Sequence, residues 1–398
     1  MIVFSVNQFS EDFMMKKVLI INQHANNLGD EAAGVALIER LIGEKYIVAI
    51  NYLGEGELHY KNASLLTDIP RIKEIGIINI VTKIVANMIG FTFDGNRLLK
   101  KYSKEIDEAN VVVVSPSGAD LGHYTGWAAL LNFMFVKSFD KKIIFCLNSI
   151  DESSNRVFEK MKRLLLNGCS IYVREKRCLD YMRKIGKSAK FGIDTAFLLK
   201  KPSEIIKKRK LIFVYSRFDF LFTDNSKKNY ADIMIRYVIK DILRFAKKEN
   251  KTIELLPHLL TELEEKYLME VFRKIKEVFP YVSYNNKVKN AFDYQRAIAE
   301  AEVVISMRYH PLVLAAKNYV PFIGLSYDPK MQEVASYAGQ GRYVHGIDNI
   351  SKNSIYNDLT DIYRNYETVV KNIQTNIETL IYTAEQPLNE IKRVDVNV

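Results

Sequence analysis

Residues 303–330 read VVISMRYHPLVLAAKNYVPFIGLSYDPK. The apolar run VVIS is typical of a strand, Pro311 suits the first position of a helix, and FIGLS forms a second apolar run. Strand, helix and strand in this order predict a parallel βαβ unit. The carboxyl ends of parallel strands lie at one edge of a sheet. We therefore expect Arg308, His310 and Lys330 to face a single crevice.

The alternation of strands and helices extends over most of the chain. The run NVVVVSPSGAD at 110–120 is continuous, which is typical of a parallel strand covered on both faces. The alternation of strands and helices begins again after a charged, Pro-containing segment at 200–210. The pattern predicts an α/β fold with two Rossmann-like, doubly wound domains facing each other in a GT-B-like arrangement. A C-terminal helix is expected to pack back on the first domain.

The changes in pattern give the expected domain limits. They are an N-terminal extension at 1–15, a first Rossmann-like domain at 16–199, a linker at 200–210, a second Rossmann-like domain at 211–353 and a C-terminal helical segment at 354–398. Ligands of open parallel sheets bind outside the carboxyl ends of the strands. The crevice between the two domains is therefore the expected site.

The composition limits the class of partner. The 398 residues include 57 Lys and Arg against 47 Asp and Glu, a net charge of +10 that favours anionic ligands or an anionic membrane surface. No aromatic-basic RNA-binding motif or zinc finger is present, so we expect no nucleic-acid partner. The three Cys lack metal-ligand spacing and indicate reduced thiols in the cytoplasm. No apolar stretch approaches the roughly 18 residues that span a bilayer.

The opening stretch carries residue types suited to an anion and a proton. Free backbone N–H groups at a helix N-terminus attract an anion, and the Arg308 guanidinium adds a bidentate fork for phosphate or carboxylate. His310 can exchange a proton near neutral pH. Lys330 would reach the same anion, with Asp328 to orient it. The alternative is that His310 caps the helix and Arg308 pairs with an acidic side chain.

The segment SMRYHPLVLAAKNYVPFIGLSYDPKMQEVASYAG, residues 306–339, resembles the C-terminal signature of the polysaccharide pyruvyl transferase family. That family shares a Ser-Met-Arg-x-His segment, a Val-Pro-Phe-x-Gly run and a Tyr-Asp-x-Lys turn. Three further segments agree with the family in order: NNLGDEAAGVAL at 26–37, SIYVREKRCLDYM at 170–182 and GIDTAFLL at 192–199. The resemblance spans residues 16–345.

The resemblance implies transfer of the enolpyruvyl unit of phosphoenolpyruvate to two hydroxyls of a sugar, as a cyclic ketal. By matching position, Arg308, His310 and Arg174 correspond to the family's active-site residues. Phosphoenolpyruvate carries two anionic groups, so Arg174 and Arg308 would bind one each, with Lys330 assisting, and His310 is the expected general acid or base. The first domain would hold the acceptor and the second the donor, with no cofactor and no metal.

One loop departs from the family pattern. After its third strand the family usually has a Gly-rich turn, where this chain has SPSGADLGHYTG at 115–126 and keeps Gly118. Side chains in place of glycines make backbone approach to a ligand harder. The departure bears on how the acceptor lies in this part of the cleft.

Further candidates for acceptor binding lie at other strand ends. Asp30 also suits the N-cap of the first helix, and Gly29 would permit close backbone approach. Asp194 is interpreted as a structural turn residue, and His24 is ambiguous. The acceptor-binding candidates are Asn27, Gly29, Asp30, Asp120, His123, His258 and Arg217.

The leading hypothesis is a cytoplasmic transferase acting on a sugar of a cell-surface polysaccharide, such as an exopolysaccharide or capsule. The acceptor candidates include a lipid-linked precursor, for which the basic surface would favour contact with the inner face of the membrane. The alternative is a nucleotide-sugar glycosyltransferase on the same GT-B fold. A third interpretation is a non-enzymatic anion-binding or scaffold protein, favoured by the altered loop.

Overall fold

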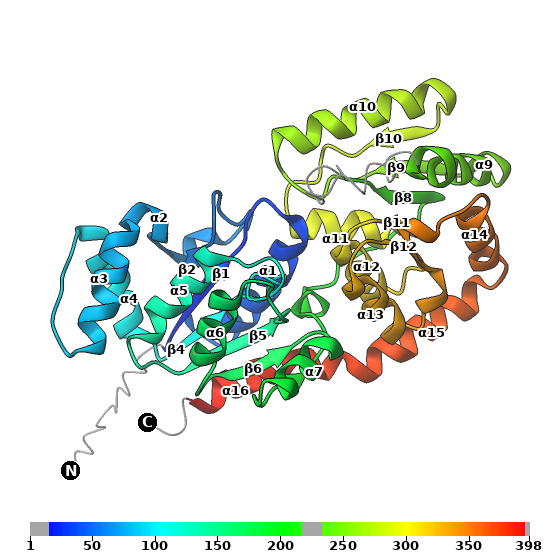
Figure 1. The fold of residues 1–398 in the computed structure, drawn as a ribbon. Coiled ribbons are helices and arrows are strands. Elements are labelled where there is room, and N and C mark those ends of the chain that lie inside the picture. The colour runs from blue at the N-terminus through cyan, green and yellow to red at the C-terminus, as the bar shows by residue number, and fades with distance from the viewer. Residues whose placement is uncertain (1–15, 217–232, 395–398) are drawn as a thin grey trace, which may run out of the picture.

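The computed structural model describes residues 16–216 and 233–394. The N-terminal extension expected at 1–15 and the candidate Arg217 lie outside these residues. Two parallel sheets form the centres of two domains that lie against each other (Figure 1). The expected pair of Rossmann-like domains is confirmed, although the limits of each domain stay predictions.

The first sheet has seven parallel strands in the order β3-β2-β1-β4-β5-β6-β7. Its strands are β1 (Lys17–Gln23), β2 (Ile47–Tyr52), β3 (Leu66–Ile69), β4 (Val111–Val114), β5 (Ile143–Asn148), β6 (Ser170–Val173) and β7 (Lys190–Phe191). Its helices are α1 (Leu28–Gly43), α2 (Ile72–Ile75), α3 (Ile77–Met88), α4 (Arg97–Glu108), α5 (Trp127–Lys137), α6 (Arg156–Leu165) and α7 (Lys176–Lys184). The order reverses between β1 and β4, which places a ligand crevice there.

The second sheet has six parallel strands in the order β10-β9-β8-β11-β12-β13. Its strands are β8 (Lys210–Val214), β9 (Thr252–Leu255), β10 (Val282–Tyr284), β11 (Val303–Ser306), β12 (Phe322–Ser326) and β13 (Val344–Gly346). Its helices are α9 (Lys240–Lys248), which continues the π-helical turn η4 (Met234–Ile239), α10 (Glu262–Val278), α11 (Ala291–Ala299), α12 (Tyr309–Lys317) and α13 (Pro329–Tyr337). The reversal here falls between β8 and β11.

Three α-helices and the 3₁₀ turn η7 (Ile381–Glu385) end the described chain, and η7 and the last helix return to the first domain. Helix α14 (Ser354–Arg364) packs on α9, and α15 (Tyr366–Leu380) leads back along the molecule (Figure 1). Helix α16 (Gln386–Val394) packs beside β5, and Glu390 accepts a hydrogen bond from the Tyr172 hydroxyl at 2.6 Å. The expected return of the C-terminal helix is confirmed.

Alternating side chains of the central strands enter different cores. Val18 and Ile20 of β1 point into one core, and Leu19 and Ile21 into another, so both faces of the first sheet are covered. The core of Val18 and Ile20 continues without a break to Leu312 of the second domain. The two domains therefore share apolar packing between α1, α11, α12 and the 3₁₀ turn η2 (Thr195–Leu198).

Backbone hydrogen bonds also join the domains. Leu28 N–H donates to the His258 carbonyl at 3.0 Å, and Leu260 N–H donates to the Asn26 carbonyl at 2.9 Å. The loop after β1 is thereby fixed to the loop after β9, because each pairs the other's backbone groups.

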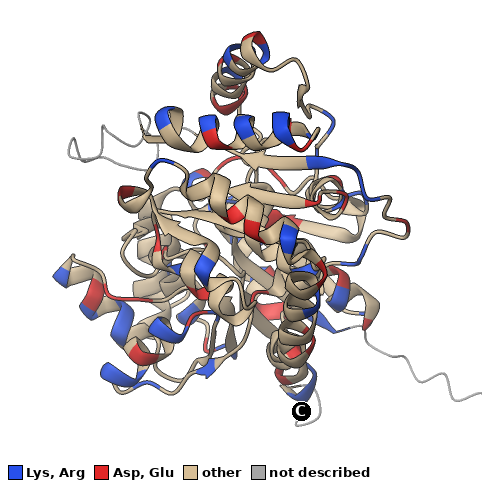
Figure 2. Ribbon diagram, turned by 90° about the vertical axis from the view of Figure 1, so that its right-hand side faces the viewer, with Lys and Arg blue, Asp and Glu red and all other residues tan. Residues whose placement is uncertain are grey.

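Basic and acidic residues alternate along several of the helices (Figure 2). This mixture is typical of solvated helix faces. Within the described residues, no helix combines the length and the apolar character needed to cross a membrane.

Candidate active site

A cavity of about 530 Å³ lies between the carboxyl ends of the two sheets. Both domains contribute polar and aromatic side chains to it. Polar groups that converge in a cleft mark a candidate ligand site. Its lining residues are His24, Asn27, Asp30, Gly118, His123, Tyr124, Arg174, His258, Arg308, Tyr309, His310, Tyr327, Asp328 and Lys330. The structure thus brings together Arg308, His310 and Lys330, as the strand-end argument predicted.

Helix α12 begins directly after β11, so its N-terminus opens into the cavity. Arg308 is the N-cap residue and His310 is the second helical residue. Pro311 is the third helical residue, not the first as expected. The first-turn N–H groups of a helix have no partner within the helix, so its missing N–H is tolerated at the third position too.

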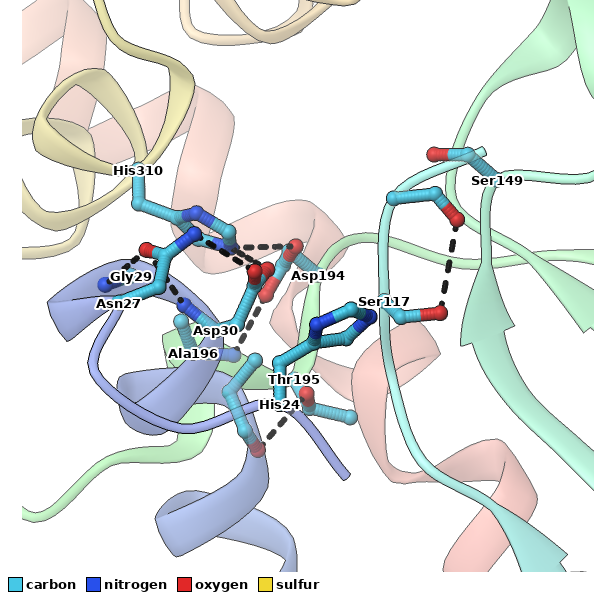
Figure 3. Close-up of polar contacts among 12 residues, drawn as sticks. His24, Asn27, Gly29, Asp30, Ser117, Ser149, Asp194, Thr195, Ala196 and His310 are labelled. Carbon is cyan, nitrogen blue, oxygen red and sulfur yellow. Dashed lines mark hydrogen bonds and ion pairs between the residues drawn. The ribbon is translucent and has the colours of Figure 1, made fainter. Parts of the chain in front are cut away.

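The ring of His310 is buried and faces two carboxylates (Figure 3). Its Nε2 lies 3.9 Å from Asp30 Oδ1 and 3.7 Å from Asp194 Oδ2, and it has no hydrogen-bond partner. Burial, aided by the cations Arg174 and Lys330 and opposed by Asp30, lowers the pKa of His310 to about 3. The imidazole is therefore neutral at pH 7.

The Arg308 guanidinium is held from one side and open on another. Its Nε donates a hydrogen bond to Ser216 Oγ at 3.0 Å, and that hydroxyl donates to Glu264 Oε1 at 2.8 Å. One terminal nitrogen of Arg308 has no hydrogen-bond partner although the side chain is buried. A buried donor without a partner is costly, so this nitrogen favours an anion in the cavity.

Arg174 was expected to hold one anion of the donor, but much of its charge is already matched. Its terminal nitrogen lies 2.6 Å from Asp194 Oδ2, and its Nε donates to Ser149 Oγ at 3.2 Å. The guanidinium also lies over the Tyr309 ring, 5.0 Å from its centroid. Asp194, which was interpreted as a structural turn residue, caps η2 and neutralises Arg174 at the same time. A donor role for Arg174 stays a prediction.

Lys330 reaches the cavity beside two partners. Its Nζ lies 3.3 Å from Asp328 Oδ2 and 3.3 Å from the Tyr124 hydroxyl. Burial opposes its charge, but Asp328 and the tyrosines Tyr124 and Tyr327 outweigh burial and raise its pKa. Lys330 therefore stays charged. Asp328 is also the N-cap of α13, because its Oδ1 accepts a hydrogen bond from the Lys330 backbone N–H.

The loop after β1 differs in detail from the expectation. Helix α1 starts at Leu28 because Asn27 is its N-cap, accepting from the Gly29 and Asp30 N–H groups at 3.0 and 3.4 Å (Figure 3). The N-cap assignment of Asp30 is therefore wrong. Asp30 Oδ2 instead accepts from the Asn27 side chain at 2.7 Å.

Gly29 does permit a close approach, but the approaching group is His310. A Cβ at Gly29 would lie 2.2 Å from His310 Nδ1. Gly29 is buried under that ring and is not among the residues that line the cavity.

The loop at 115–126, which departs from the family pattern, is fixed by Asp151, which follows strand β5. Asp151 accepts from the His123 backbone N–H at 2.8 Å, its second oxygen lies 2.8 Å from His123 Nδ1, and Arg177 donates to that oxygen at 2.9 Å. Asp120 lies outside the cavity lining and pairs with His24 at 2.8 Å. That pair, despite burial, raises the pKa of His24 to about 9. Asp120 therefore positions His24 rather than facing the cavity itself.

His258 is buried beside His310. Its Nδ1 lies 3.0 Å from the Tyr294 hydroxyl, and the two histidine rings stack with centroids 6.4 Å apart. Burial, with the nearby cation Arg308, lowers the pKa of His258 well below its usual value. His258 therefore lines the cavity as a neutral group.

Three tyrosines in the cavity were not predicted: Tyr124, Tyr309 and Tyr327. Each is the sequence neighbour of a predicted site residue, namely His123, Arg308 or Asp328. Among the described residues, no three His, Cys, Asp or Glu side chains converge as metal ligands would.

Comparison with known proteins gives one family. The sequence model of the polysaccharide pyruvyl transferase family matches residues 27–329. That range includes the loop after β1, the Arg174 strand end and the α12 N-terminus. No curated protein matches the chain.

Solved structures share the fold at low identity. A co-structure of S. aureus MnaA with UDP aligns with a TM-score of 0.60 and 12% identity over 96% of this chain and 98% of that one. A putative UDP-N-acetylglucosamine 2-epimerase from Listeria monocytogenes gives 0.58 and 12%, over 90% and 91%. A glycosyltransferase from Rickettsia africae ESF-5 gives 0.57 and 10%, over 97% and 100%. At such identity these likenesses show a common fold.

Proposed function

Because this chain belongs to the polysaccharide pyruvyl transferase family, we propose that it transfers the enolpyruvyl unit of phosphoenolpyruvate to two hydroxyls of one sugar, forming a pyruvate ketal. The observation that carries the proposal is the α12 N-terminus. There, an unpartnered Arg308 nitrogen and the unpartnered Nε2 of His310 share one cavity with the cation Lys330.

The charges of the cavity favour a small ligand with two anionic groups. Arg174 is matched by Asp194, and Lys330 is largely matched by Asp328. Arg308 is thus the main uncompensated cation, and it lies where the first N–H groups of α12 point. We assign the phosphate of phosphoenolpyruvate to Arg308 and the helix N-terminus. The carboxylate would then lie toward Lys330 and Arg174.

The proton balance of the reaction suits a neutral histidine. His310 would relay the proton of the first sugar hydroxyl to the methylene carbon of phosphoenolpyruvate, which becomes the methyl group. The C=C electron pair would form that new C–H bond, and positive charge would therefore develop on the second carbon as the hydroxyl oxygen bonds to it. Asp30 and Asp194, within 3.9 Å of Nε2, would stabilise the transient imidazolium. The second hydroxyl would displace phosphate, and its proton would leave with that group.

The acceptor in this proposal is a sugar of a cell-surface polysaccharide or of its lipid-linked precursor. It would enter from the first domain, past Asn27, Asp30 and His123, which line the cavity on that side. A lipid-linked acceptor would bring the protein to the inner face of the membrane.

Mass spectrometry of candidate acceptor sugars incubated with phosphoenolpyruvate tests the reaction directly. The expected product gains the mass of a pyruvyl ketal and releases one phosphate. Arg308→Lys should weaken thermal stabilisation by phosphoenolpyruvate, because Lys lacks the planar fork. His310→Ala should retain that stabilisation and lose at least about a hundredfold in turnover. Wild-type turnover by His310→Ala would refute the assigned role.

The alternative function is a nucleotide-sugar glycosyltransferase. Its support is the fold shared with the S. aureus MnaA–UDP co-structure and the Rickettsia africae glycosyltransferase. Thermal stabilisation by UDP-sugars and not by phosphoenolpyruvate would favour this alternative over the ketal-forming reaction.

A further inference from the structure

One guanidinium just outside the cavity contacts the acids that lead to two of its cations. Arg177 is the second residue of α7 and is not among the residues that line the cavity. Its Nε donates to Glu175, its Nη1 donates to Asp151 at 2.9 Å, and its Nη2 lies 3.6 Å from Asp328 Oδ1. A planar guanidinium can serve several acids at once, whereas the ammonium of Lys is a point charge.

The contact with Asp328 crosses between the domains. Arg177 belongs to the first domain, and Asp328 follows β12 of the second. The Nη2 atom of Arg177 is buried and has no hydrogen-bond partner, so the ion pair with Asp328 is what offsets its burial. Asp328 Oδ2 in turn lies 3.3 Å from Lys330 Nζ. Arg177 therefore holds, from the first domain, the acid that orients Lys330.

The contact with Glu175 leads to a second cation of the cavity. Glu175 is buried, and its other carboxylate oxygen accepts a hydrogen bond from the Ser149 hydroxyl. Ser149 Oγ accepts in turn from Arg174 Nε at 3.2 Å. Loss of Arg177 would leave the buried Glu175 carboxylate without this cation. Because each group of the network restricts the next, the position of Arg174 would then be less well defined.

The two networks end on the cations to which the proposed function assigns the carboxylate of phosphoenolpyruvate. We propose that Arg177 is a positioning residue, which holds Lys330 and Arg174 at the spacing that this carboxylate requires. The inference rests on the proposed function, because it concerns the donor of that reaction. Arg308, to which the phosphate is assigned, is held separately by Ser216 of the second domain. Loss of Arg177 should therefore impair binding of the carboxylate and spare binding of the phosphate.

The alternative is that Arg177 only joins the two domains. The Lys176 backbone N–H also donates to Glu333 of α13, so the first turn of α7 is attached to the second domain by a contact that does not involve Arg177. A role confined to domain contact would change stability. It would not change the affinity for phosphoenolpyruvate relative to that for inorganic phosphate.

Thermal stabilisation of the full chain, titrated with phosphoenolpyruvate or with inorganic phosphate, gives both dissociation constants. Wild-type protein should bind phosphoenolpyruvate more tightly than phosphate, because the carboxylate adds a second charge-assisted contact. Arg177→Gln should weaken binding of phosphoenolpyruvate about tenfold and leave binding of phosphate unchanged. Arg177→Lys should recover part of the loss, because it restores the charge but not the planar fork.

The matched control is Arg183, further along α7. Its side chain is 70% exposed and contacts Asp180 at 3.0 Å. Arg183→Gln should bind both ligands as the wild type does. Unchanged affinity of Arg177→Gln for phosphoenolpyruvate, or an equal loss for both ligands, would overturn the positioning role and leave the proposed function intact. A wild type that phosphoenolpyruvate does not stabilise would overturn the proposed function, and the positioning role with it.

Discussion

Gly29 lies where the first turn of α1 meets the His310 ring of the other domain, and no side chain fits between them. A Cβ there would approach His310 Cγ to 2.4 Å. We expect Gly29→Ala to displace His310, to lower stability by about 1–3 kcal/mol and to impair any reaction that uses the ring. Chemical denaturation together with a turnover assay measures both effects.

Gly43 provides the matched control for this substitution. It ends the same helix, and a Cβ there would have no heavy atom within 4 Å. Gly43→Ala should therefore be neutral or slightly stabilising. If the two variants behave alike, packing against His310 is not what Gly29 provides.

His310 makes stability depend on pH in a direction that its burial sets. Its pKa is about 3 when folded and 6.5 when unfolded, so between those values the unfolded chain binds a proton that the folded chain does not. Stability is fully present above pH 6.5 and is lost as the pH falls toward 3. The cost at pH 5 is about 2 kcal/mol.

Melting temperatures recorded from pH 4 to pH 8 check this prediction. His310→Gln should flatten the decline below pH 6.5, whatever it does to stability at pH 7. His258, whose pKa is also lowered, should leave part of the decline in place. If His310→Gln keeps the wild-type dependence of melting temperature on pH, His310 is protonated as readily in the folded chain as in the unfolded chain, and the prediction is wrong.

At the scale of single elements, sequence patterns predicted the strands well and the helix starts less well. The run VVVV of β4 is wholly buried, as a continuous apolar run indicates. The start of α1 was placed too late because Asp30 and Asn27 are both good caps. Only the backbone conformation of Asn27 shows which residue accepts the first N–H bonds. The start of α12 was also placed too late, at Pro311, because the residue types of Tyr309 and His310 do not indicate a helix.

Asn27 joins the capping of α1 to the contact between domains. Its side chain accepts two N–H bonds, and its backbone pairs with Leu259 of the second domain. Asn27→Ala should cost about 1 kcal/mol through the lost cap, and Asn27→Ser, which keeps a capping oxygen without placing a second carboxylate beside Asp30, should restore most of that loss. Because Asn27 also lines the cavity, both substitutions should raise the Michaelis constant for the acceptor.

A second N-cap separates these two effects. Asn155 caps α6 by accepting from Phe158 N–H at 3.0 Å, and it is not among the cavity residues. Asn155→Ala should lower stability to a similar extent and leave the Michaelis constant unchanged. An altered constant in both variants would mean that loss of a cap alone disturbs the cavity.

At the scale of the whole molecule, the alternation of strands and helices predicted two facing sheets, but it did not predict the contacts between the two domains. Arg308, His310 and Lys330 could be placed in one crevice because strand direction fixes which ends meet. The pairing of Arg174 with Asp194 could not, because both follow strands of the first domain and either could have faced the donor. The contact of Gly29 with His310 depends on the angle between domains, which no local pattern records.

The C-terminal helix makes the first domain depend on residues at the far end of the chain. Ile391 of α16 is fully buried in the same core as Ile144 of β5 and Tyr172 of β6. We expect Ile391→Ala to lower the stability of the first domain by about 2–5 kcal/mol, the cost of a cavity in a packed core.

Lys392, the next residue, pairs with Glu44 at 2.6 Å, but both side chains are about half exposed. Lys392→Ala should therefore cost less than about 1 kcal/mol. Hydrogen exchange of the β5 and β6 amides would detect the difference. Equal protection in the two variants would show that the first domain is stable without the packing of α16.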